Sequence, residues 1–222
     1  MVKFILNGLT AAAAKGATLL ETARFYGIDI PTLCHYDGLN PSGACRLCLV
    51  EVGTPGRSRL VSSCTYPVGE GLNVRTHSRR VIKTRQVLLE LYLATCPSSK
   101  TIQDLASKHH VTTVRFRAKH EECILCGLCT RYCADQMQGR AIGLVNRGAE
   151  RRVAGPFNKK SEECRLCGGC MFICPVCQAR CQGPQEKNPL CSACLNLAPA
   201  CLDRYHEAMC YLDPCVACEL EK

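Results

Sequence analysis

The chain reads Cys123-Ile-Leu-Cys126-Gly-Leu-Cys129-Thr-Arg-Tyr-Cys133 and, thirty residues later, Cys164-Arg-Leu-Cys167-Gly-Gly-Cys170-Met-Phe-Ile-Cys174-Pro175. Both stretches have the spacing C-x2-C-x2-C-x3-C, which is typical of proteins that hold two [4Fe–4S] clusters. In such proteins three closely spaced thiolates wrap one cluster, and the fourth cysteine ligates the other cluster. We therefore assign Cys123, Cys126, Cys129 and Cys174 to one [4Fe–4S] cluster, and Cys164, Cys167, Cys170 and Cys133 to the second.

The first copy of this pattern departs from the usual one after its last cysteine. Pro175 follows Cys174, and a proline there helps the chain to turn away from the cluster, but Ala134 follows Cys133. This departure weakens the case for Cys133 as a ligand.

Cysteine usage decides between metal ligation and disulfides. The 222 residues contain 21 cysteines, only 5% aromatic residues and no tryptophan, so we expect a small core that bound metal helps to stabilise. A secreted disulfide scaffold is the alternative. The odd cysteine number, the cluster spacing and the lack of an apolar signal segment in Met1–Gly8 favour metal ligation in the reducing cytoplasm.

The formal charge of +9 raises the question of a nucleic-acid partner. Thiolate-bound clusters are anionic and offset part of this charge, and the basic residues are scattered in short groups such as Arg79-Arg80 and Lys159-Lys160. We therefore interpret the basic groups as a solvated surface or as docking patches for acidic partners, and we expect no nucleic acid. No stretch approaches the 18 or more apolar residues of a membrane span.

Residues 1–78 predict a small α+β domain that begins as a β-grasp ferredoxin does. Asn7-Gly8 predicts a hairpin between strands 2–6 and 9–14, because both residues tolerate positive φ. Thr18 and Glu21 form the sequence pattern of a capping box for a helix that stops near Gly27. Further short strands are expected over residues 49–52, 58–61 and 71–75.

A second cysteine pattern, C-x10-C-x2-C-x15-C, lies in this domain and comprises Cys34, Cys45, Cys48 and Cys64. Gly38 and Gly43 lie in the loop, where the backbone must pass close to the ligated atoms. This spacing resembles the first module of the large iron–sulfur subunit of respiratory complex I and of iron-only hydrogenases. The resemblance implies that the four cysteines hold a [2Fe–2S] cluster, and a zinc site is the alternative.

Residues 79–111 predict a helical connector. Apolar pairs recur there at helical spacing: Val81-Ile82, Val87-Leu88 and Leu91-Tyr92. Pro97 ends this helix at Cys96, and residues 99–109 predict a second short helix. Many relatives of complex I carry an extra cluster here with the pattern His-x3-Cys-x2-Cys-x5-Cys. This region has Cys96 alone, so we predict that the extra cluster is missing.

Residues 112–182 predict a bacterial-type ferredoxin-like domain with two [4Fe–4S] clusters in two pseudo-symmetric halves. A strand is expected over residues 112–117, before the first ligand loop. Residues 141–148 and 153–157 predict a β-hairpin inserted between the loops. This insert also resembles the complex I and hydrogenase family, in which a hairpin separates the ferredoxin halves.

Residues 183–222 form a cysteine-rich tail with little to bury, so metal is expected to organise it. The pairs Cys191-x2-Cys194 and Cys215-x2-Cys218 have nearly the spacing of a zinc ribbon. A further [4Fe–4S] cluster held by some of the tail cysteines is the alternative to zinc.

No motif for substrate chemistry is visible in the sequence. It has neither a G-x-G-x-x-G loop nor a P-loop, and no nucleophile with a base beside it. We interpret the chain as a row of one-electron centres that acts as a non-catalytic subunit.

The resemblance to the complex I large subunit covers about residues 1–180. It implies a flavoprotein partner that oxidises NAD(P)H at FMN, and a terminal oxidoreductase subunit or low-potential ferredoxin as acceptor. Mixed cluster types fit a soluble, anaerobic complex, including one that bifurcates electrons. Two alternatives are a free-standing multi-cluster ferredoxin and a metal-binding regulatory protein that senses redox state.

Overall fold

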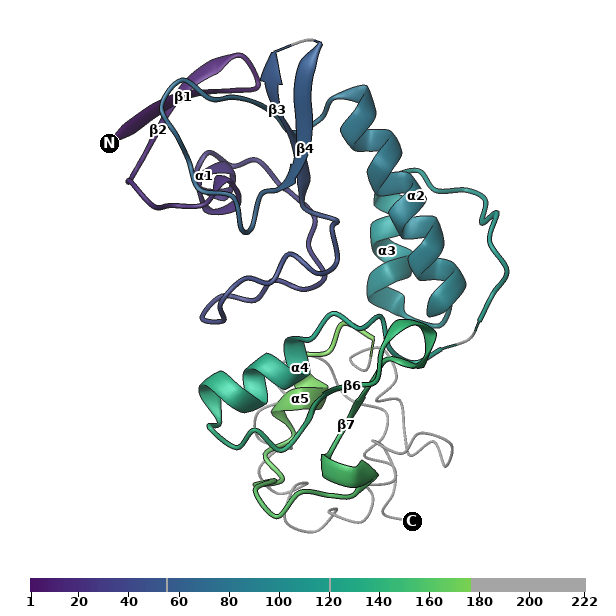
Figure 1. The fold of residues 1–222 in the computed structure, drawn as a ribbon. Coiled ribbons are helices and arrows are strands. Elements are labelled where there is room, and N and C mark those ends of the chain that lie inside the picture. The colour runs from purple at the N-terminus through teal and green to yellow at the C-terminus, as the bar shows by residue number, and fades with distance from the viewer. Residues whose placement is uncertain (55, 120, 177–222) are drawn as a thin grey trace, which may run out of the picture. The chain divides into compact units, whose positions relative to one another are not determined.

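The computed structural model describes residues 1–54, 56–119 and 121–176 (Figure 1). They form two compact units, one of residues 1–97 with 102–126 and one of residues 98–101 with those from 127 onward. A mixed sheet and several helices make this an α+β protein, as predicted. The predicted tail ligands lie outside the described residues: Cys191, Cys194, Cys215 and Cys218.

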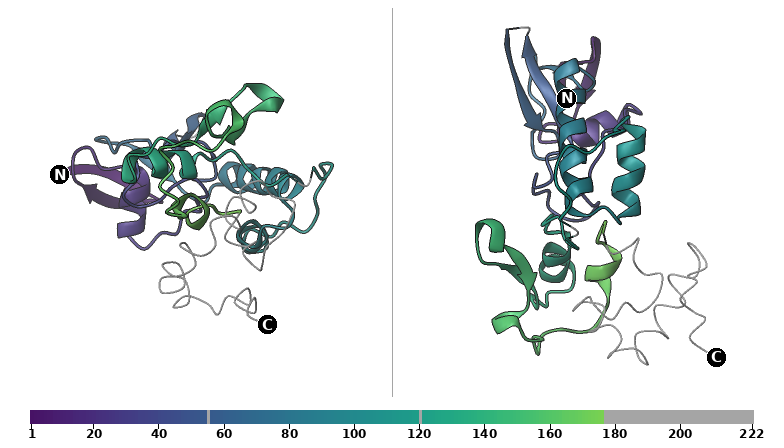
Figure 2. Two further views of the ribbon diagram at one scale, coloured as in Figure 1. Left: turned by 90° about the horizontal axis from the view of Figure 1, so that it is seen from below. Right: turned by 90° about the vertical axis from the view of Figure 1, so that its right-hand side faces the viewer.

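One mixed sheet dominates the first unit (Figures 1 and 2). Its strands are β1 (Val2–Leu6), β2 (Leu9–Ala13), β3 (Leu49–Thr54), β4 (Arg57–Ser62) and β5 (Asn73–Arg75). The order across the sheet is β2-β1-β5-β3-β4, with β1 and β5 parallel and the other neighbours antiparallel. The strands predicted for residues 1–78 are therefore confirmed.

Helix α1 (Leu19–Phe25) packs on this sheet and closes the core. Phe4 and Leu6 alternate along β1 toward the core, and Leu20 and Ala23 of α1 are fully buried against them. The turn at Asn7-Gly8 has φ of 52° and 88°, as the hairpin prediction requires. This core belongs wholly to the first unit.

Helices α2 (Arg79–Thr95) and α3 (Lys100–Lys108) lie side by side in both Figure 1 and Figure 2. The predicted end of α2 at Cys96 is confirmed. The predicted helix is confirmed, but its apolar pairs do not all lie on the buried face, because Ile82 and Leu91 are about two-fifths exposed. The face that packs against β3 is instead a row of every fourth residue: Val81, Arg85 and Leu89.

Residues 112–117 do not form the predicted strand. Val114 and Phe116, the apolar positions of the alternation, are 44% and 39% exposed. Alternation produces a strand only where a neighbouring strand completes the ladder and one face is buried. Arg115 instead reaches back to α2, where its Nε donates to Oε2 of Glu90 at 2.7 Å.

The second unit consists of short elements. They are α4 (Leu128–Arg131), η1 (Tyr132–Gln136), β6 (Gly143–Val145), η2 (Gly148–Glu150), β7 (Arg152–Ala154), η3 (Pro156–Asn158) and α5 (Gly169–Phe172). Strands β6 and β7 pair antiparallel from Gly143 with Ala154 to Val145 with Arg152. The hairpin predicted between the two ligand loops is therefore confirmed.

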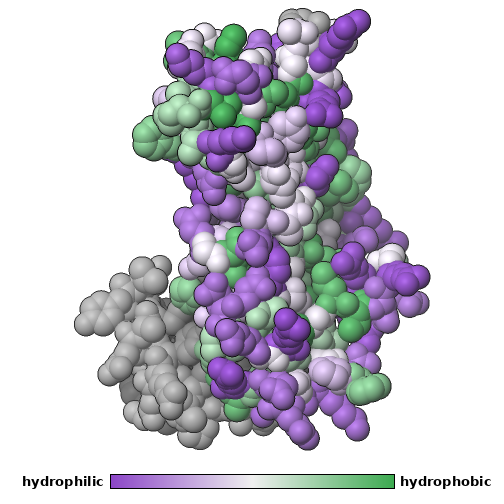
Figure 3. Space-filling view, turned by 60° about the vertical axis from the view of Figure 1, so that its left-hand side comes forward, coloured by the Kyte–Doolittle hydropathy of each residue, from purple (hydrophilic) through white to green (hydrophobic). Residues whose placement is uncertain are grey.

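The surface is mixed in character. On the face shown in Figure 3, hydrophilic side chains are spread among hydrophobic ones rather than gathered in one patch. Within the described residues, no helix has the length and apolar character needed to cross a bilayer.

Candidate iron–sulfur centres

The four cysteines of the first unit's predicted set come together as two pairs. Cys34 and Cys45 lie in the loop before β3, Cys48 directly precedes β3, and Cys64 follows β4. All four are at most 2% exposed. The Sγ atoms of Cys48 and Cys64 are 3.4 Å apart, and the thiols of Cys34 and Cys45 share a hydrogen bond. Two sulfur pairs are compatible with two iron ions that each bind two protein thiolates.

The backbone around this set presents N–H groups to the sulfurs. The N–H of Cys45 donates to Sγ of Cys34 at 3.2 Å. Arg46 adopts the left-handed conformation with φ of 56°, and such a turn directs successive N–H groups into a concave site. Gly38 and Gly43 have φ of 86° and 64°, as expected for a loop that approaches ligated atoms closely.

Each sulfur pair contains one thiol that ionises more easily than its partner. The hydrogen bond from the Cys45 thiol, helped by backbone N–H groups, lowers the pKa of Cys34. The hydrogen bond with Cys64 lowers the pKa of Cys48 in the same way. Hydrogen bonding to these partners, together with burial, raises the pKa of Cys45 and Cys64. Iron ligation needs all four as thiolates, so binding a cluster here releases protons.

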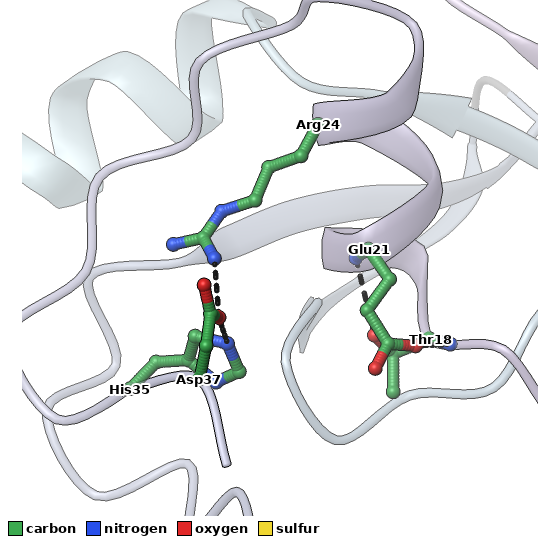
Figure 4. Close-up of polar contacts among 5 residues, drawn as sticks. All are labelled: Thr18, Glu21, Arg24, His35 and Asp37. Carbon is green, nitrogen blue, oxygen red and sulfur yellow. Dashed lines mark hydrogen bonds and ion pairs between the residues drawn. The ribbon is translucent and has the colours of Figure 1, made fainter.

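Helix α1 anchors the ligand loop (Figure 4). Nη1 of Arg24 lies 3.1 Å from Oδ1 of Asp37, and Nε2 of His35 lies 3.4 Å from the same oxygen. The start of α1 is fixed by the predicted capping box. The N–H of Glu21 donates to Oγ1 of Thr18 at 3.2 Å, and the N–H of Thr18 donates to Oε2 of Glu21 at 2.8 Å.

Two side chains of α2 contact this site and were not predicted from the sequence. Oη of Tyr92 donates to the carbonyl of Cys45 at 2.8 Å, and Nη2 of Arg85 donates to the carbonyl of Leu49 at 2.8 Å. Burial raises the pKa of Tyr92, and thiolates at Cys45, Cys34 and Cys126 raise it further. No local sequence pattern indicates these contacts. The one available signal is Arg85, a charged residue that lies four positions from both Val81 and Leu89 and so shares a helix face with two apolar residues.

The second predicted set surrounds a cavity of about 480 Å³ in the second unit. Its lining includes all four cysteines of that set: Cys133, Cys164, Cys167 and Cys170. Burial raises the pKa of Cys170 to about 11, and thiolates at Cys167, Cys164 and Cys133 contribute to the increase. The N–H of Ala141 donates to Sγ of Cys133 at 3.3 Å. Cys133 thus joins the other three, although Ala134 replaces the usual proline.

Two local features bring Cys133 to this cavity. Cys133 lies in η1, a π-helical turn that continues α4, and π-helical turns often occur at functional sites. Gly169 at the start of α5 lets the other loop approach, because a Cβ there would lie 2.1 Å from the ring of Tyr132. A side chain at residue 169 would therefore force the ring of Tyr132 to move.

The two C-x2-C-x2-C loops have the same backbone conformation. Leu125 and Leu166, at matching positions, are left-handed with φ of 55° and 56°. Gly127 and Gly168 are left-handed too, with φ of 70° and 69°, and each precedes a short helix. A leucine in this conformation is strained, and strain of this kind concentrates at binding sites. The repeated sequence of the two loops is therefore accompanied by a repeated backbone conformation at these positions.

The remaining predicted set consists of Cys123, Cys126, Cys129 and Cys174. Cys123 and Cys126 fall in the first unit, whereas Cys129 and Cys174 fall in the second, so this set stays a prediction. Its loop shows the same backbone-to-sulfur contact as the others, because the N–H of Leu125 donates to Sγ of Cys123 at 3.3 Å. The cysteine of the connector, Cys96, is fully buried, as expected for a small apolar residue.

Comparison with known families and curated proteins gives matches to a 2Fe-2S domain family and to subunits of oxidoreductases and a hydrogenase. Residues 1–79 match the family described as "2Fe-2S iron-sulfur cluster binding domain". The chain is 32% identical over 173 residues to the NADPH-Fe(3+) oxidoreductase subunit alpha of Geobacter sulfurreducens, covering 67% of this chain and 20% of that protein. It is 30% identical over 187 residues to the NADP-reducing hydrogenase subunit HndD of Solidesulfovibrio fructosivorans, covering 71% and 32%.

A third curated relative is the NADH-ubiquinone oxidoreductase 75 kDa subunit of Reclinomonas americana, 28% identical over 179 residues, covering 69% of this chain and 26% of the relative. The chain thus spans about a fifth to a third of the length of these relatives. Among solved structures it matches an NAD+-reducing [NiFe]-hydrogenase in the H2-reduced state. That match has a TM-score of 0.62 and 27% identity, and covers 75% of this chain and 84% of that one. Residues 1–79 are therefore similar to a 2Fe-2S domain, and the chain is similar over two thirds or more of its length to subunits of NADPH- and NADH-linked oxidoreductases and of an NADP-reducing hydrogenase.

Proposed function

We propose that this chain is a non-catalytic electron-transfer subunit of an NAD(P)-linked oxidoreductase complex. The observation that carries this proposal is the gathering of two separate cysteine sets, each drawn from distant parts of the sequence. Bound at these sulfurs, iron–sulfur clusters would supply one-electron chemistry. The protein supplies the thiolates and N–H donors to sulfur at both sets, and it shields the first set from water.

The proposed ligands follow the sequence assignment. A [2Fe–2S] cluster takes Cys34, Cys45, Cys48 and Cys64; the two [4Fe–4S] clusters take Cys123, Cys126, Cys129 and Cys174, and Cys164, Cys167, Cys170 and Cys133. A further centre, zinc or [4Fe–4S], takes Cys191, Cys194, Cys215 and Cys218. The proposed domains are residues 1–78, 79–111, 112–182 and 183–222.

Tyr92 supports a path for electrons within the first unit. Its hydroxyl donates to the carbonyl of Cys45, a ligand in the proposed [2Fe–2S] site. A thiolate at Cys126, a ligand in the first proposed [4Fe–4S] site, also lies close enough to raise the pKa of Tyr92. Within the first unit, one aromatic side chain therefore contacts the backbone of Cys45 and lies within the field of Cys126.

The proposed partners come from the relatives. Subunits of NADPH- and NADH-linked oxidoreductases and of an NADP-reducing hydrogenase match this chain over two thirds or more of its length. We propose that a flavoprotein subunit with FMN delivers electrons from NAD(P)H, and that a terminal oxidoreductase subunit or a low-potential ferredoxin receives them. A cytoplasmic complex, including one that bifurcates electrons, fits this arrangement.

Ligand substitutions in the anaerobically purified complex test the proposal. Cys167→Ser should remove one [4Fe–4S] cluster, lower the iron content and abolish NAD(P)H-driven reduction of the terminal acceptor. NAD(P)H oxidation by an artificial acceptor at the flavin should continue. Cys96→Ala is the matched control, because Cys96 is a buried cysteine outside the proposed sets.

The proposal fails if Cys167→Ser keeps full iron content and physiological turnover, or if Cys96→Ala loses as much iron. Purification of the chain without any flavoprotein, together with free exchange among acceptors, would support a free-standing ferredoxin instead.

A further inference from the structure

Arg85 occupies a position on α2 where an apolar residue is expected. It is 1% exposed and lies between Val81 and Leu89, which are fully buried on the same helix face. Its Nη2 donates to the carbonyl of Leu49, the residue that follows Cys48, at 2.8 Å. The guanidinium therefore lies directly behind the ligand loop of the first cysteine set.

The buried guanidinium has few partners. Among the described residues, its Nε is buried without a hydrogen-bond partner, and no carboxylate forms an ion pair with it. Asp29 exerts a favourable field, but its carboxylate is 70% exposed and pairs with Lys108. A buried charge without a nearby counter-charge is strongly unfavourable. In the part of the chain that the structure describes, no carboxylate in contact with Arg85 therefore balances its charge.

The electrostatics around Arg85 point to the cysteine set as the source of that anion. Burial lowers the pKa of Arg85 to about 10, so the side chain is still cationic at neutral pH, and a thiolate at Cys48 opposes the decrease. His77 and His109 lie within the field of Arg85, and burial together with this field lowers the pKa of both. Of the two acidic groups that act on Arg85, Asp29 is exposed and Cys48 is buried, so Cys48 is the buried source of negative charge beside the guanidinium.

We infer that Arg85 is the buried counter-cation of the iron–sulfur centre at Cys34, Cys45, Cys48 and Cys64 and raises its reduction potential. The inference rests on the proposed function. Four thiolates and two sulfides outweigh the charge of two iron ions, and reduction adds one more negative charge to the site. A fixed positive charge in a low-dielectric surrounding stabilises the reduced state more than the oxidised one. Arg85 is therefore a potential-setting residue that acts from behind the ligands.

A redox titration of the full chain tests this role. The anaerobically purified wild type and Arg85→Met are titrated while the EPR signal of the reduced [2Fe–2S] centre is followed. In Arg85→Met, the ratio of reduced to oxidised centre at a fixed ambient potential should fall about tenfold, which for one electron is about 59 mV to the negative side. Arg85→Lys keeps the charge and should keep the ratio within about threefold of wild type.

Arg79→Met is the matched control. It removes the same charge from the same helix, but Arg79 is exposed, so water and salt screen its field and the ratio should not move. Should Arg85→Met fail to retain iron, Arg85→Gln replaces it, because the amide can still donate to the carbonyl of Leu49. A reduction potential of the [2Fe–2S] centre that is lower in Arg85→Gln than in wild type supports the inference.

Two outcomes overturn the inference. One is an unchanged potential in an Arg85→Met or Arg85→Gln protein with full iron and sulfide content. The other is an equal shift in Arg79→Met, which would indicate a general effect of net charge. A wild-type chain without any two-iron EPR signal would instead count against the proposed function itself, so the two failures are distinguishable.

Discussion

A folded core encloses the first cysteine set, whereas the second set surrounds a cavity whose apolar side chains are mostly only half-buried. Cys34, Cys45, Cys48 and Cys64 are at most 2% exposed, and Cys48 and Cys64 are part of the apolar core between the sheet and α1. Cys167 is exposed, and the other cysteines of its set are half-buried. In the described part of the second unit the buried apolar residues are few: Leu128, Ala141, Ile173 and Val176.

The difference in burial between the two units indicates which part of the fold depends on bound metal. A sheet of several strands with a helix on one face buries enough apolar surface to be stable by itself. Helices of four residues, such as α4 and α5, are far too short to be stable alone. We therefore expect the first unit to keep its structure without iron, and the second unit to need its clusters.

Removal of iron should give the largest effect and tests the comparison directly. Treatment with a strong chelator under reducing, anaerobic conditions should lower the opening free energy of residues 127–176 close to zero, because this described part of the unit buries few apolar residues of its own. Amides of β1, β3 and β5 should stay protected. Hydrogen exchange followed by mass spectrometry measures both, and reconstitution with iron and sulfide is the control. Equal loss of protection in both units would contradict the comparison.

A cavity in the core of the first unit should reverse the pattern. Leu20→Ala removes a fully buried side chain between α1 and the sheet, and should lower the opening free energy of the first unit by about 2–5 kcal/mol. Protection of residues 127–176 should not change. Leu9→Ala is the control, because Leu9 is 74% exposed and its truncation should cost less than about 0.5 kcal/mol. Equal effects of the two substitutions would mean that this core is not what stabilises the unit.

Local chemistry explains which parts of this fold the sequence predicts well. The turn at Asn7-Gly8 depends on two consecutive residues, and the helix start at Thr18 depends on a four-residue segment that ends at Glu21. Pro97 ends a helix because it lacks an N–H. Each of these predictions depends on residues that are neighbours in sequence, and the structure confirms each of them.

The wrong predictions concern contacts between distant segments. The alternation of apolar and polar residues at 112–117 does not reveal that no neighbouring strand pairs with this segment. Likewise, the apolar pairs of α2 do not reveal that Arg85 lies on the buried face of the helix. Ala134 made Cys133 a weaker candidate, yet the π-helical turn brings Cys133 to the cavity. In these places tertiary packing overrides the local pattern, so a single sequence does not reveal it.

The cap of α1 should contribute a smaller effect, again confined to the first unit. Thr18→Ala removes the side chain that accepts from the N–H of Glu21, and should lower the opening free energy of α1 by about 1 kcal/mol. Hydrogen exchange of the α1 amides measures the change. Thr113→Ala is the control, because Thr113 is exposed outside any helix or strand. Loss of the second unit's protection in Thr18→Ala would contradict the independence of the two units.

The smallest effect should be a dependence on pH that also belongs to the first unit. Burial lowers the pKa of His109 from its ordinary value of 6.5, and the charges of Arg85 and Lys108 add to this, with Asp29 acting in the opposite direction. The unfolded state therefore binds the proton more readily, so stability is complete above about pH 6.5 and falls as the pH is lowered through that value. Hydrogen exchange of α2 and α3, corrected for the intrinsic pH dependence, should show this slope in wild type.

His109→Gln should flatten this slope, because the variant has no imidazole to protonate. Ser107→Ala is the matched control, since it changes an exposed side chain of α3 without removing a titrating group, and it should keep the wild-type slope. The slope should also become shallower in Arg85→Met, because the charge that helps to keep His109 neutral is gone. An unchanged slope in His109→Gln would assign the pH dependence to other groups, and a slope confined to residues 127–176 would move it to the unit that depends on metal.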